Sequence, residues 1–431
     1  MNNTNQSAAK SFRAAWQKES PASPGWLQIL RNEAMEQFAL SGFPTTRLED
    51  WKYTDVGKLA AAYPQWLVNE PAAANDIADN TLNIANAIRI AFVDGVYRPD
   101  RSSQNLPDSI LVGTLADLAT TNPEIMEKHL GQLASNSDSG FVALNSVFSE
   151  TAVLISIPDG IAIQQPIYID YFSATAETSI QPRLIANLGT ASKATIVEHF
   201  SGAGPAITNA VTEIHCGPDS QLAYHRLQED HAEAWHTSVQ YILLERNAYL
   251  NSVNIDAGAG MARNELRLCL AGAGASADAK GLLLADSSRH VDSRLSVEHA
   301  APNTRSRERY RSILADNARG VFNGRILVQQ AAQKTAAELT NRNLLLNRGA
   351  EINTKPELEI YADDVKCAHG ATTGQLDETS MFYLMSRGIA PQEARNILVQ
   401  AFASELLTDI AIPAIVERTQ QAMQTLRFAG Q

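Results

Sequence analysis

The two residues of this sequence that are best suited to metal binding or catalysis are Cys367 and His369, in the run Lys366-Cys-Ala-His-Gly370. On an extended chain, residues i and i+2 point to the same side, so the thiol and the imidazole would converge. A soft sulfur ligand beside an imidazole suits iron, zinc or copper(I) and does not suit magnesium or calcium. Two ligands cannot complete a tetrahedral site, so further ligands must come from a loop or from another subunit. The alternative is a Cys–His nucleophile, although close neighbours rarely reach the geometry that activation requires.

Two other groups of residues are weaker candidates for metal binding or catalysis. His225, His231 and His236 lie in one polar stretch, but their spacings of six and five match no common metal-ligand turn. A solvated loop is the simpler interpretation. Asp363-Asp364 could serve as the acid–base pair of a β-helical enzyme that acts on acidic polysaccharides, but adjacent strand residues face opposite sides. Ending a strand is the simpler role for this acidic pair.

Composition and missing motifs exclude several classes of protein. The sequence has no G-x-x-x-x-G-K-[ST] phosphate loop, no G-x-S-x-G and no H-E-x-x-H. A formal net charge of −12 disfavours binding to nucleic acids or anionic membranes. Three scattered cysteines cannot form a disulfide framework. The polar N-terminus lacks a signal segment, and no apolar run is long enough to span a bilayer, so we expect a cytoplasmic protein.

An internal repeat of about 30 residues predicts the fold. One strand family contains Glu265-Leu-Arg-Leu268, Arg294-Leu-Ser-Val297, Arg325-Ile-Leu-Val328 and Glu357-Leu-Glu-Ile360, with Leu266, Leu295, Ile326 and Leu358 as equivalent positions. A second family lies between them and aligns Leu284, Leu314 and Leu346. Two strand families that advance together are typical of a solenoid whose stacked coils share one core. A β-sandwich would have no reason to repeat at a fixed interval, so we predict a mainly β chain with a parallel β-helix core.

The flanking regions have a different character. Residues 1–150 mix helical patterns with one strand at 88–93 and are expected to form an N-terminal α/β cap. This cap includes a helix that follows Pro24 and ends near Gly42. Residues 44–54 are interpreted as a packed surface loop. The β-helix is expected over 151–374 and a helical domain over 375–431, with helices at 377–387, 391–407 and 413–428.

Several long motifs of this sequence are typical of one known family. The longest is Lys355-Pro-Glu-Leu-Glu-Ile-Tyr-Ala-Asp-Asp-Val-Lys-Cys-Ala-His-Gly370. The others are Arg47-Leu-Glu-Asp-Trp-Lys-Tyr-Thr54, Ser306-Arg-Glu-Arg-Tyr-Arg311, Gly320-Val-Phe-Asn-Gly-Arg-Ile-Leu-Val328, Ala332-Gln-Lys-Thr335, Asn343-Leu-Leu-Leu346 and Phe382-Tyr-Leu-Met-Ser-Arg-Gly388. Together these motifs resemble the SufB/SufD proteins of the SUF iron–sulfur cluster assembly system. The form of the longest motif and the low cysteine count resemble the branch that pairs with SufB. Ala368 stands where that branch often has Ser.

The resemblance implies a right-handed parallel β-helix with helical flanks and a scaffold that is not an enzyme. It implies a heterodimer with SufB through the β-helix and docking of the ATPase SufC on the C-terminal helical domain, which leaves this chain without an ATP site of its own. Transient iron or a nascent iron–sulfur cluster would be shared with SufB, with His369 as the first candidate ligand and Cys367 as the second. In isolation the chain could also form a homodimer. A polysaccharide-active enzyme and a purely structural partner of SufB stay open as alternatives.

The same resemblance leads to two expectations about the C-terminal helices. The helix at 391–407 should bury Ala394, Ile397, Leu398, Ala401 and Phe402, which would leave Arg387-Gly388 and 405–409 free for SufC. A chain that ends at Gly374 should keep a soluble β-helix and lose binding to SufC.

Overall fold

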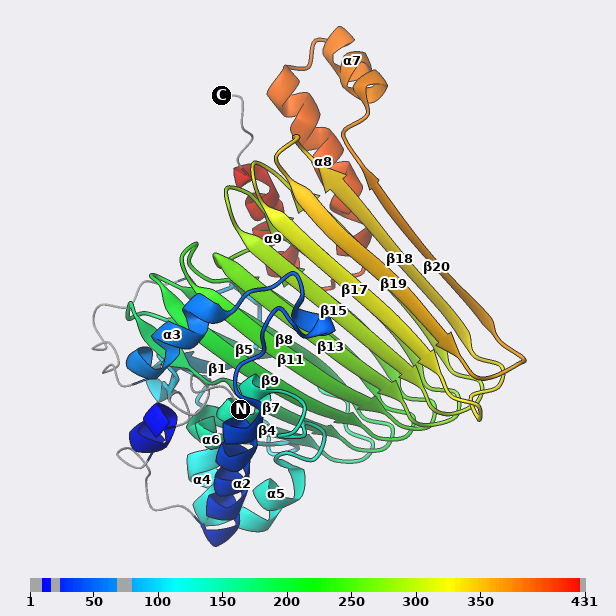
Figure 1. The fold of residues 1–431 in the computed structure, drawn as a ribbon. Coiled ribbons are helices and arrows are strands. Elements are labelled where there is room, and N and C mark those ends of the chain that lie inside the picture. The colour runs from blue at the N-terminus through cyan, green and yellow to red at the C-terminus, as the bar shows by residue number, and fades with distance from the viewer. Residues whose placement is uncertain (1–9, 17–23, 68–79, 427–431) are drawn as a thin grey trace.

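A parallel β-solenoid forms the centre of the protein (Figure 1). The computed structural model describes residues 10–16, 24–67 and 80–426. Nearly every strand pairs in parallel with the strand two places along the chain, so that each coil adds one strand to each of two sheets. The expected mainly β chain with a parallel solenoid core, an N-terminal α/β region and C-terminal helices is confirmed.

The two sheets, here called sheet A and sheet B, contain all the strands of the described residues. Sheet A consists of β1 (Ile88–Val93), β2 (Val96–Tyr97), β5 (Ile167–Ser173), β8 (Lys193–Gly202), β10 (Gln221–Glu229), β12 (Tyr249–Asp256), β14 (Ser276–Ala285), β16 (Arg305–Leu314), β18 (Ala336–Leu345) and β20 (Lys366–Gly374). Sheet B consists of β3 (Leu111–Thr114), β4 (Ala152–Ile157), β6 (Thr178–Ile180), β7 (Arg183–Leu188), β9 (Ala206–Cys216), β11 (Trp235–Leu244), β13 (Met261–Leu270), β15 (His290–His299), β17 (Arg319–Val328) and β19 (Glu351–Ile360).

The strand register confirms the repeat but corrects its alignment. Leu295 on β15 lies opposite Gly324 of β17, whereas Ile326 lies opposite Val297. The predicted equivalence of Leu295 and Ile326 was therefore two residues out, which leaves both side chains facing the interior. The second family was one residue out, because Leu284 pairs with Ile313. A slip of one residue changes the face of the sheet, and Leu314 accordingly packs in the interior while Leu284 packs outside.

The N-terminal helices cover the first part of the outer face of sheet B. They are α2 (Gly25–Ser41), α3 (Gly57–Trp66), α4 (Leu115–Thr121), α5 (Pro123–His129) and α6 (Gly140–Val147), with short 3-10 turns at η1 (Glu49–Trp51), η3 (Pro99–Arg101) and η4 (Ser149–Thr151). The helix predicted after Pro24 is confirmed as α2, and it ends where Gly42 adopts a positive φ of 62°. The strand predicted at 88–93 is confirmed as β1.

The segment 44–54 is more than a surface loop. It carries the side chain of Trp51 into a buried position, where the Arg263 guanidinium of β13 stacks 3.7 Å from the centre of its ring. Such cation–π contact is favoured where the cation is shielded from water. Nearby, Thr54 donates a hydrogen bond of 2.6 Å to Asp292 of β15. The segment therefore fastens the N-terminal region to two coils of the solenoid.

Three C-terminal helices follow the last strand: α7 (Glu378–Ser386), α8 (Pro391–Leu407) and α9 (Pro413–Thr425). All three were predicted; the proposed extension of the last helix to 428 lies partly outside the described residues. Helices α8 and α9 pack on the outer face of sheet A, where they cover aliphatic side chains of β12, β14, β16 and β18. The predicted buried stripe of α8 was correct only in part. Ala394 is buried and Leu398 and Phe402 are half-buried, but Ile397 and Ala401 are exposed. The residues that α8 buries are Ala394, Val399, Ala403, Leu406 and Leu407.

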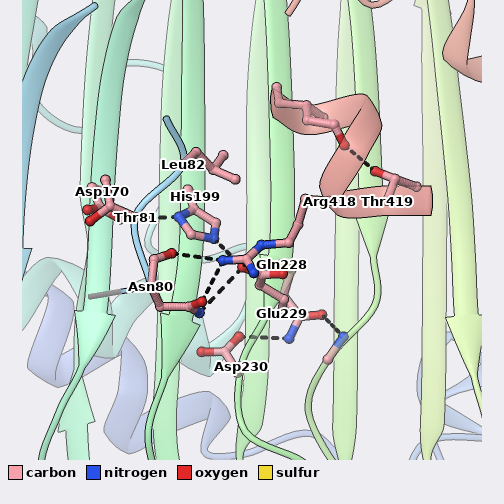
Figure 2. A network of polar contacts seen from close by, with 12 residues as sticks. Asn80, Thr81, Leu82, Asp170, His199, Gln228, Glu229, Asp230, Arg418 and Thr419 are labelled. Atoms are coloured by element: carbon pink, nitrogen blue, oxygen red, sulfur yellow. Dashed lines mark hydrogen bonds and ion pairs between the residues drawn. The ribbon is translucent and has the colours of Figure 1, made fainter. Parts of the chain in front are cut away.

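A partly buried polar network fixes α9 to the solenoid (Figure 2). Arg418 of α9 pairs with Glu229 at 3.1 Å, and Glu229 also contacts His199 Nε2 at 2.8 Å. On its other side, His199 Nδ1 lies 3.2 Å from Asp170. Burial alone would lower the pKa of His199, but the hydrogen bonds to Asp170 and Glu229 raise it to about 9. His199 is therefore a cation at neutral pH, and it links two carboxylates of neighbouring strands to the helix.

Candidate functional site at the open end of the solenoid

The solenoid ends in two strands, β19 and β20, and within the described part of the chain each has a neighbouring strand on one side only. β20 pairs with β18 and β19 pairs with β17, so both strands present free backbone donors and acceptors at the same end of the molecule (Figure 1). β20 is exposed along almost its whole length. Unpaired strand edges of this kind favour pairing with another chain.

Cys367 and His369 lie on this terminal strand and on the same side of it. The register places Cys367 opposite Ala337 and His369 opposite Leu339. Ala337 and Leu339 both pack in the interior of the solenoid, so the thiol and the imidazole face the open mouth of that interior. Cys367 is half-buried against the core, whereas His369 is exposed. The pair is therefore accessible to a molecule that covers the end of the solenoid.

The thiol of Cys367 is in its neutral form in this environment. Burial raises the pKa of Cys367 above the ordinary value, a hydrogen bond with the Ala337 backbone lowers it in part, and the charge of Glu308 raises it again. Metal binding to the thiol would therefore release a proton. Across residues 10–16, 24–67 and 80–426, no three His, Cys, Asp or Glu side chains gather closely enough to hold a metal ion. The pair alone offers an incomplete set of ligands.

Beneath the pair lies a buried carboxyl group that the sequence interpretation missed. Glu308 on β16 belongs to the same interior column as Leu339 and His369, so about two strand spacings of roughly 4.8 Å separate it from His369. The side chain is fully buried, and among the described residues no donor meets either carboxylate oxygen in good hydrogen-bond geometry. Burial raises the pKa of Glu308 to about 8. The sequence Ser306-Arg-Glu-Arg-Tyr-Arg311 contains the signal that would have predicted this position. Alternate residues of a strand face opposite sides, so if the arginines face outward, Glu308 must face the interior.

Comparison with known proteins shows to which family this chain belongs. The model described as "SUF system FeS cluster assembly, SufBD core domain" matches residues 171–402, and the model of the SufBD protein N-terminal region matches residues 2–169. This chain belongs to the SufB/SufD family. An iron–sulfur cluster assembly SufBD family protein of Synechocystis is 30% identical over 88% of this chain and 86% of its own length.

Two further SufB/SufD relatives bear the name SufD. The iron–sulfur cluster assembly protein SufD of Escherichia coli is 29% identical over 92% of this chain and 90% of its own length. SufD of Bacillus subtilis is 23% identical over 92% of this chain and 93% of its own length. These relatives are named as cluster assembly proteins, so the polysaccharide-enzyme alternative has no support among them. The family and the open end of the solenoid together direct attention to Cys367 and His369.

The structure does not bring together the other histidines considered from the sequence, and the solvated loop expected for them was wrong, because His225 and His236 are buried in strands. His225 of β10 faces outward, and burial lowers its pKa to about 4. His236 of β11 faces inward, where it contacts Arg226 at 2.7 Å. His231 lies in the turn between these strands. The exposed pair Asp363-Asp364 occupies the bend between β19 and β20, in agreement with a role in ending a strand.

The C-terminal helices offer one exposed apolar surface, which we call the α7 patch. It consists of Phe382, Tyr383 and Met385 of α7, which are 73%, 57% and 44% exposed, and Ile397 of α8, which is 39% exposed. None of the nine residues of α7 is buried. By contrast, Glu405 and Asp409 contact arginine and lysine side chains of the solenoid. The stretch 405–409 is therefore engaged within the chain and is not the free surface that we expected.

Proposed function

We propose that this chain is the SufD-type scaffold subunit of an iron–sulfur cluster assembly complex in the cytoplasm. It pairs with SufB through the open end of the solenoid and docks the ATPase SufC through the C-terminal helices. His369, assisted by Cys367, supplies a ligand to iron or to a nascent cluster at the interface with SufB, and ATP hydrolysis is the task of SufC. The observation that carries this proposal is the placement of Cys367 and His369 on one side of an unpaired terminal strand.

A site divided between two subunits suits the chemistry of a transient cargo. Thiolate and imidazole are ligands that iron accepts, but a pair of them does not fill its coordination. When the remaining ligands come from a partner, the cargo is held only while the two chains are together. A small movement of one chain then opens the site without unfolding either protein. In addition, the free edges of β19 and β20 give the partner backbone groups to pair with.

Substitution of His369 tests the ligand role. Loss of even an outer-shell partner typically lowers metal affinity by about 10- to 100-fold, so loss of a direct ligand should lower it at least as much. His369→Ala should therefore preserve folding and co-purification with SufB and SufC, yet reduce bound iron and fail to support cluster maturation in cells. Cys367→Ala should have the same effect more mildly. His231→Ala, which removes a histidine from a turn of the solenoid, is the matched control.

The outcome also separates the two non-enzymatic alternatives. Full activity of His369→Ala in the complementation assay, with an unchanged iron content, would leave only the purely structural partnership with SufB. Recovery of the unmodified chain without SufB and SufC would contradict the scaffold role itself.

The α7 patch is the surface that we propose for SufC. An exposed cluster of aromatic and aliphatic side chains on a helix with no buried residue indicates an interaction site. Phe382→Asp should weaken co-purification with SufC and leave the pairing with SufB intact. Ile29→Asp is the matched control, because Ile29 is 61% exposed on α2 and lies outside the patch. Equal recovery of SufC with both variants would contradict this docking site.

A further inference from the structure

The end of α8 is held on the outer face of sheet A by a group of charged side chains, which we call the clamp. It consists of Lys280 of β14, Arg309 and Arg311 of β16, and Glu405 and Asp409 at the end of α8. Arg309 lies 3.5 Å from the Glu405 carboxylate and 3.2 Å from the Asp409 carboxylate. Lys280 Nζ lies 2.8 Å from Asp409. Arg311 donates hydrogen bonds to the Glu405 carboxylate and to the backbone carbonyl of Phe402.

The burial of Lys280 makes the clamp firmer than an ordinary surface ion pair. Exposed ion pairs contribute little to the stability of a protein, because water screens the two charges. Lys280 is only 1% exposed, and its ammonium group is surrounded by Asp278, Asn251 and Asp409. Withdrawal of Asp409 would leave a buried cation with fewer partners, which is costly. The two arginines also stabilise the negative end of the α8 dipole.

The opposite end of the helical pair is free. Helix α7 has no buried residue, and only residues 375–377 separate it from the end of β20. The turn between α7 and α8 contains Gly388 at a positive φ of 87°, with no atom near the position of a Cβ. Figure 1 shows α7 beyond the sheets and α8 returning from it to the solenoid. The pair α7–α8 is thus joined to the solenoid at one end by the terminal strand, and at the other end by the clamp together with the apolar contacts of α8 on sheet A.

The two points differ in how easily they move. β20 has one neighbouring strand and is exposed along most of its length, which are the features of a segment with low local stability. The clamp joins α8 to β14 and β16, which are paired on both sides within sheet A. The apolar contacts of Val399, Ala403 and Leu406 with the same face of sheet A add to this attachment.

We propose that the clamp is the fixed point of a lever that connects α7 to β20. A partner that displaces α7 then moves the terminal strand, because the other end of α8 cannot follow. Since β20 carries Cys367 and His369, the displacement changes how this pair is presented at the interface. The inference rests on the proposed docking of SufC on the α7 patch. Glu405 and Asp409 act as positioning residues, since they lie on the outer face and do not contact the cargo.

The experiment uses the complex of this chain with SufB and SufC. The rate at which iodoacetamide alkylates Cys367 is measured by peptide mass spectrometry with and without ATP. The test variant is Glu405→Lys/Asp409→Lys, which places two more cations against Lys280, Arg309 and Arg311. The control is Arg246→Glu, which reverses one charge of an exposed pair with Asp219 in a turn of the solenoid. The unmodified complex and the control should show an ATP-dependent change in the rate, whereas the test variant should lose it.

The same samples distinguish the lever from a simple loss of structure or of docking. The test variant should retain SufC and its ATP hydrolysis, since the α7 patch is untouched. If the double reversal prevents folding, Glu405→Gln/Asp409→Asn removes the charges without repulsion and should weaken the ATP response. The lever alone would be overturned if a variant that retains SufC kept the full effect of ATP on the alkylation rate of Cys367. It would also be overturned if ATP did not change this rate in the unmodified complex. Failure of SufC to bind the unmodified chain would overturn the docking proposal together with the lever.

Discussion

Glu308 is the residue whose position is hardest to explain by stability. A buried carboxyl group without a hydrogen-bond partner costs free energy, and an apolar residue in the same column would avoid that cost. Neighbouring interior positions show the usual solution, since Leu339 and Ile326 are fully buried aliphatic side chains. Ser306, two residues away on the same strand face, lies 2.8 Å from His299 and offsets the cost of burying Glu308 only in part. The carboxyl group in the column of His369 is thus retained at the expense of stability.

The cost of Glu308 should appear as a dependence of stability on pH. Burial raises the pKa of Glu308 from 4.5 to about 8 in the folded chain. Between these pH values the unfolded chain has released the proton that the folded chain keeps, so the free energy of unfolding falls as pH rises. The loss is roughly 1.4 kcal/mol for each pKa unit, and it is complete above pH 8. Glu308→Gln does not titrate, so its stability relative to the unmodified chain should rise by several kcal/mol between pH 4.5 and pH 8.

Urea unfolding at several pH values measures this difference. The amide that this substitution introduces also lacks partners, but its contribution to stability does not change with pH. The slope of the difference therefore reports on the carboxyl group alone. A difference that is the same at both ends of the range would contradict the assignment of a neutral, buried Glu308.

At the scale of elements, the sequence predicted a helix or strand correctly wherever its residue pattern fitted only one kind of element. The helix after Pro24, the strand at 88–93 and the three C-terminal helices were predicted at nearly their observed bounds. The repeat predicted the solenoid, but aligning similar residue types failed because coil lengths vary. Successive strands of sheet B are offset by 29, 29 and 32 residues, from Met261 to His290, Arg319 and Glu351. Turn lengths cause this variation, and turns are read less well from a single sequence than strands.

Helix α8 shows a second limit of sequence patterns. It has apolar residues on two sides, and periodicity alone does not say which side meets the sheet. Val399 and Leu406 are buried on sheet A, whereas Ile397 remains exposed. The clamp was also missed, because its members come from β14, β16 and the end of α8, far apart in the chain. Only the stacking of the coils places Lys280 and Arg309 side by side.

At the scale of the whole molecule, the C-terminal helices are part of the folded core. Helices α8 and α9 cover a continuous row of aliphatic side chains on the outer face of sheet A, among them Val253, Ile255, Leu282 and Ile313. Parallel sheets are generally covered on both faces, because their strands are apolar on both sides. The buried network of His199, Glu229 and Arg418 adds polar contacts to the same interface (Figure 2). A division of the chain at Gly374 therefore separates two halves of one hydrophobic cluster.

Removal of residues 375–431 should consequently cause aggregation, contrary to the expectation from sequence that the shortened β-helix would stay soluble. Full burial of one such aliphatic side chain contributes roughly 1.5 to 3 kcal/mol, so exposure of this row rivals the roughly 5–15 kcal/mol that typically separate folded from unfolded chains. Replacement of α7 alone by a flexible linker is the control, because none of its residues is buried. That variant should elute from size-exclusion chromatography like the full chain and fail to bind SufC. A chain ending at Gly374 that eluted as one sharp, folded species would show that sheet A does not need its helical cover.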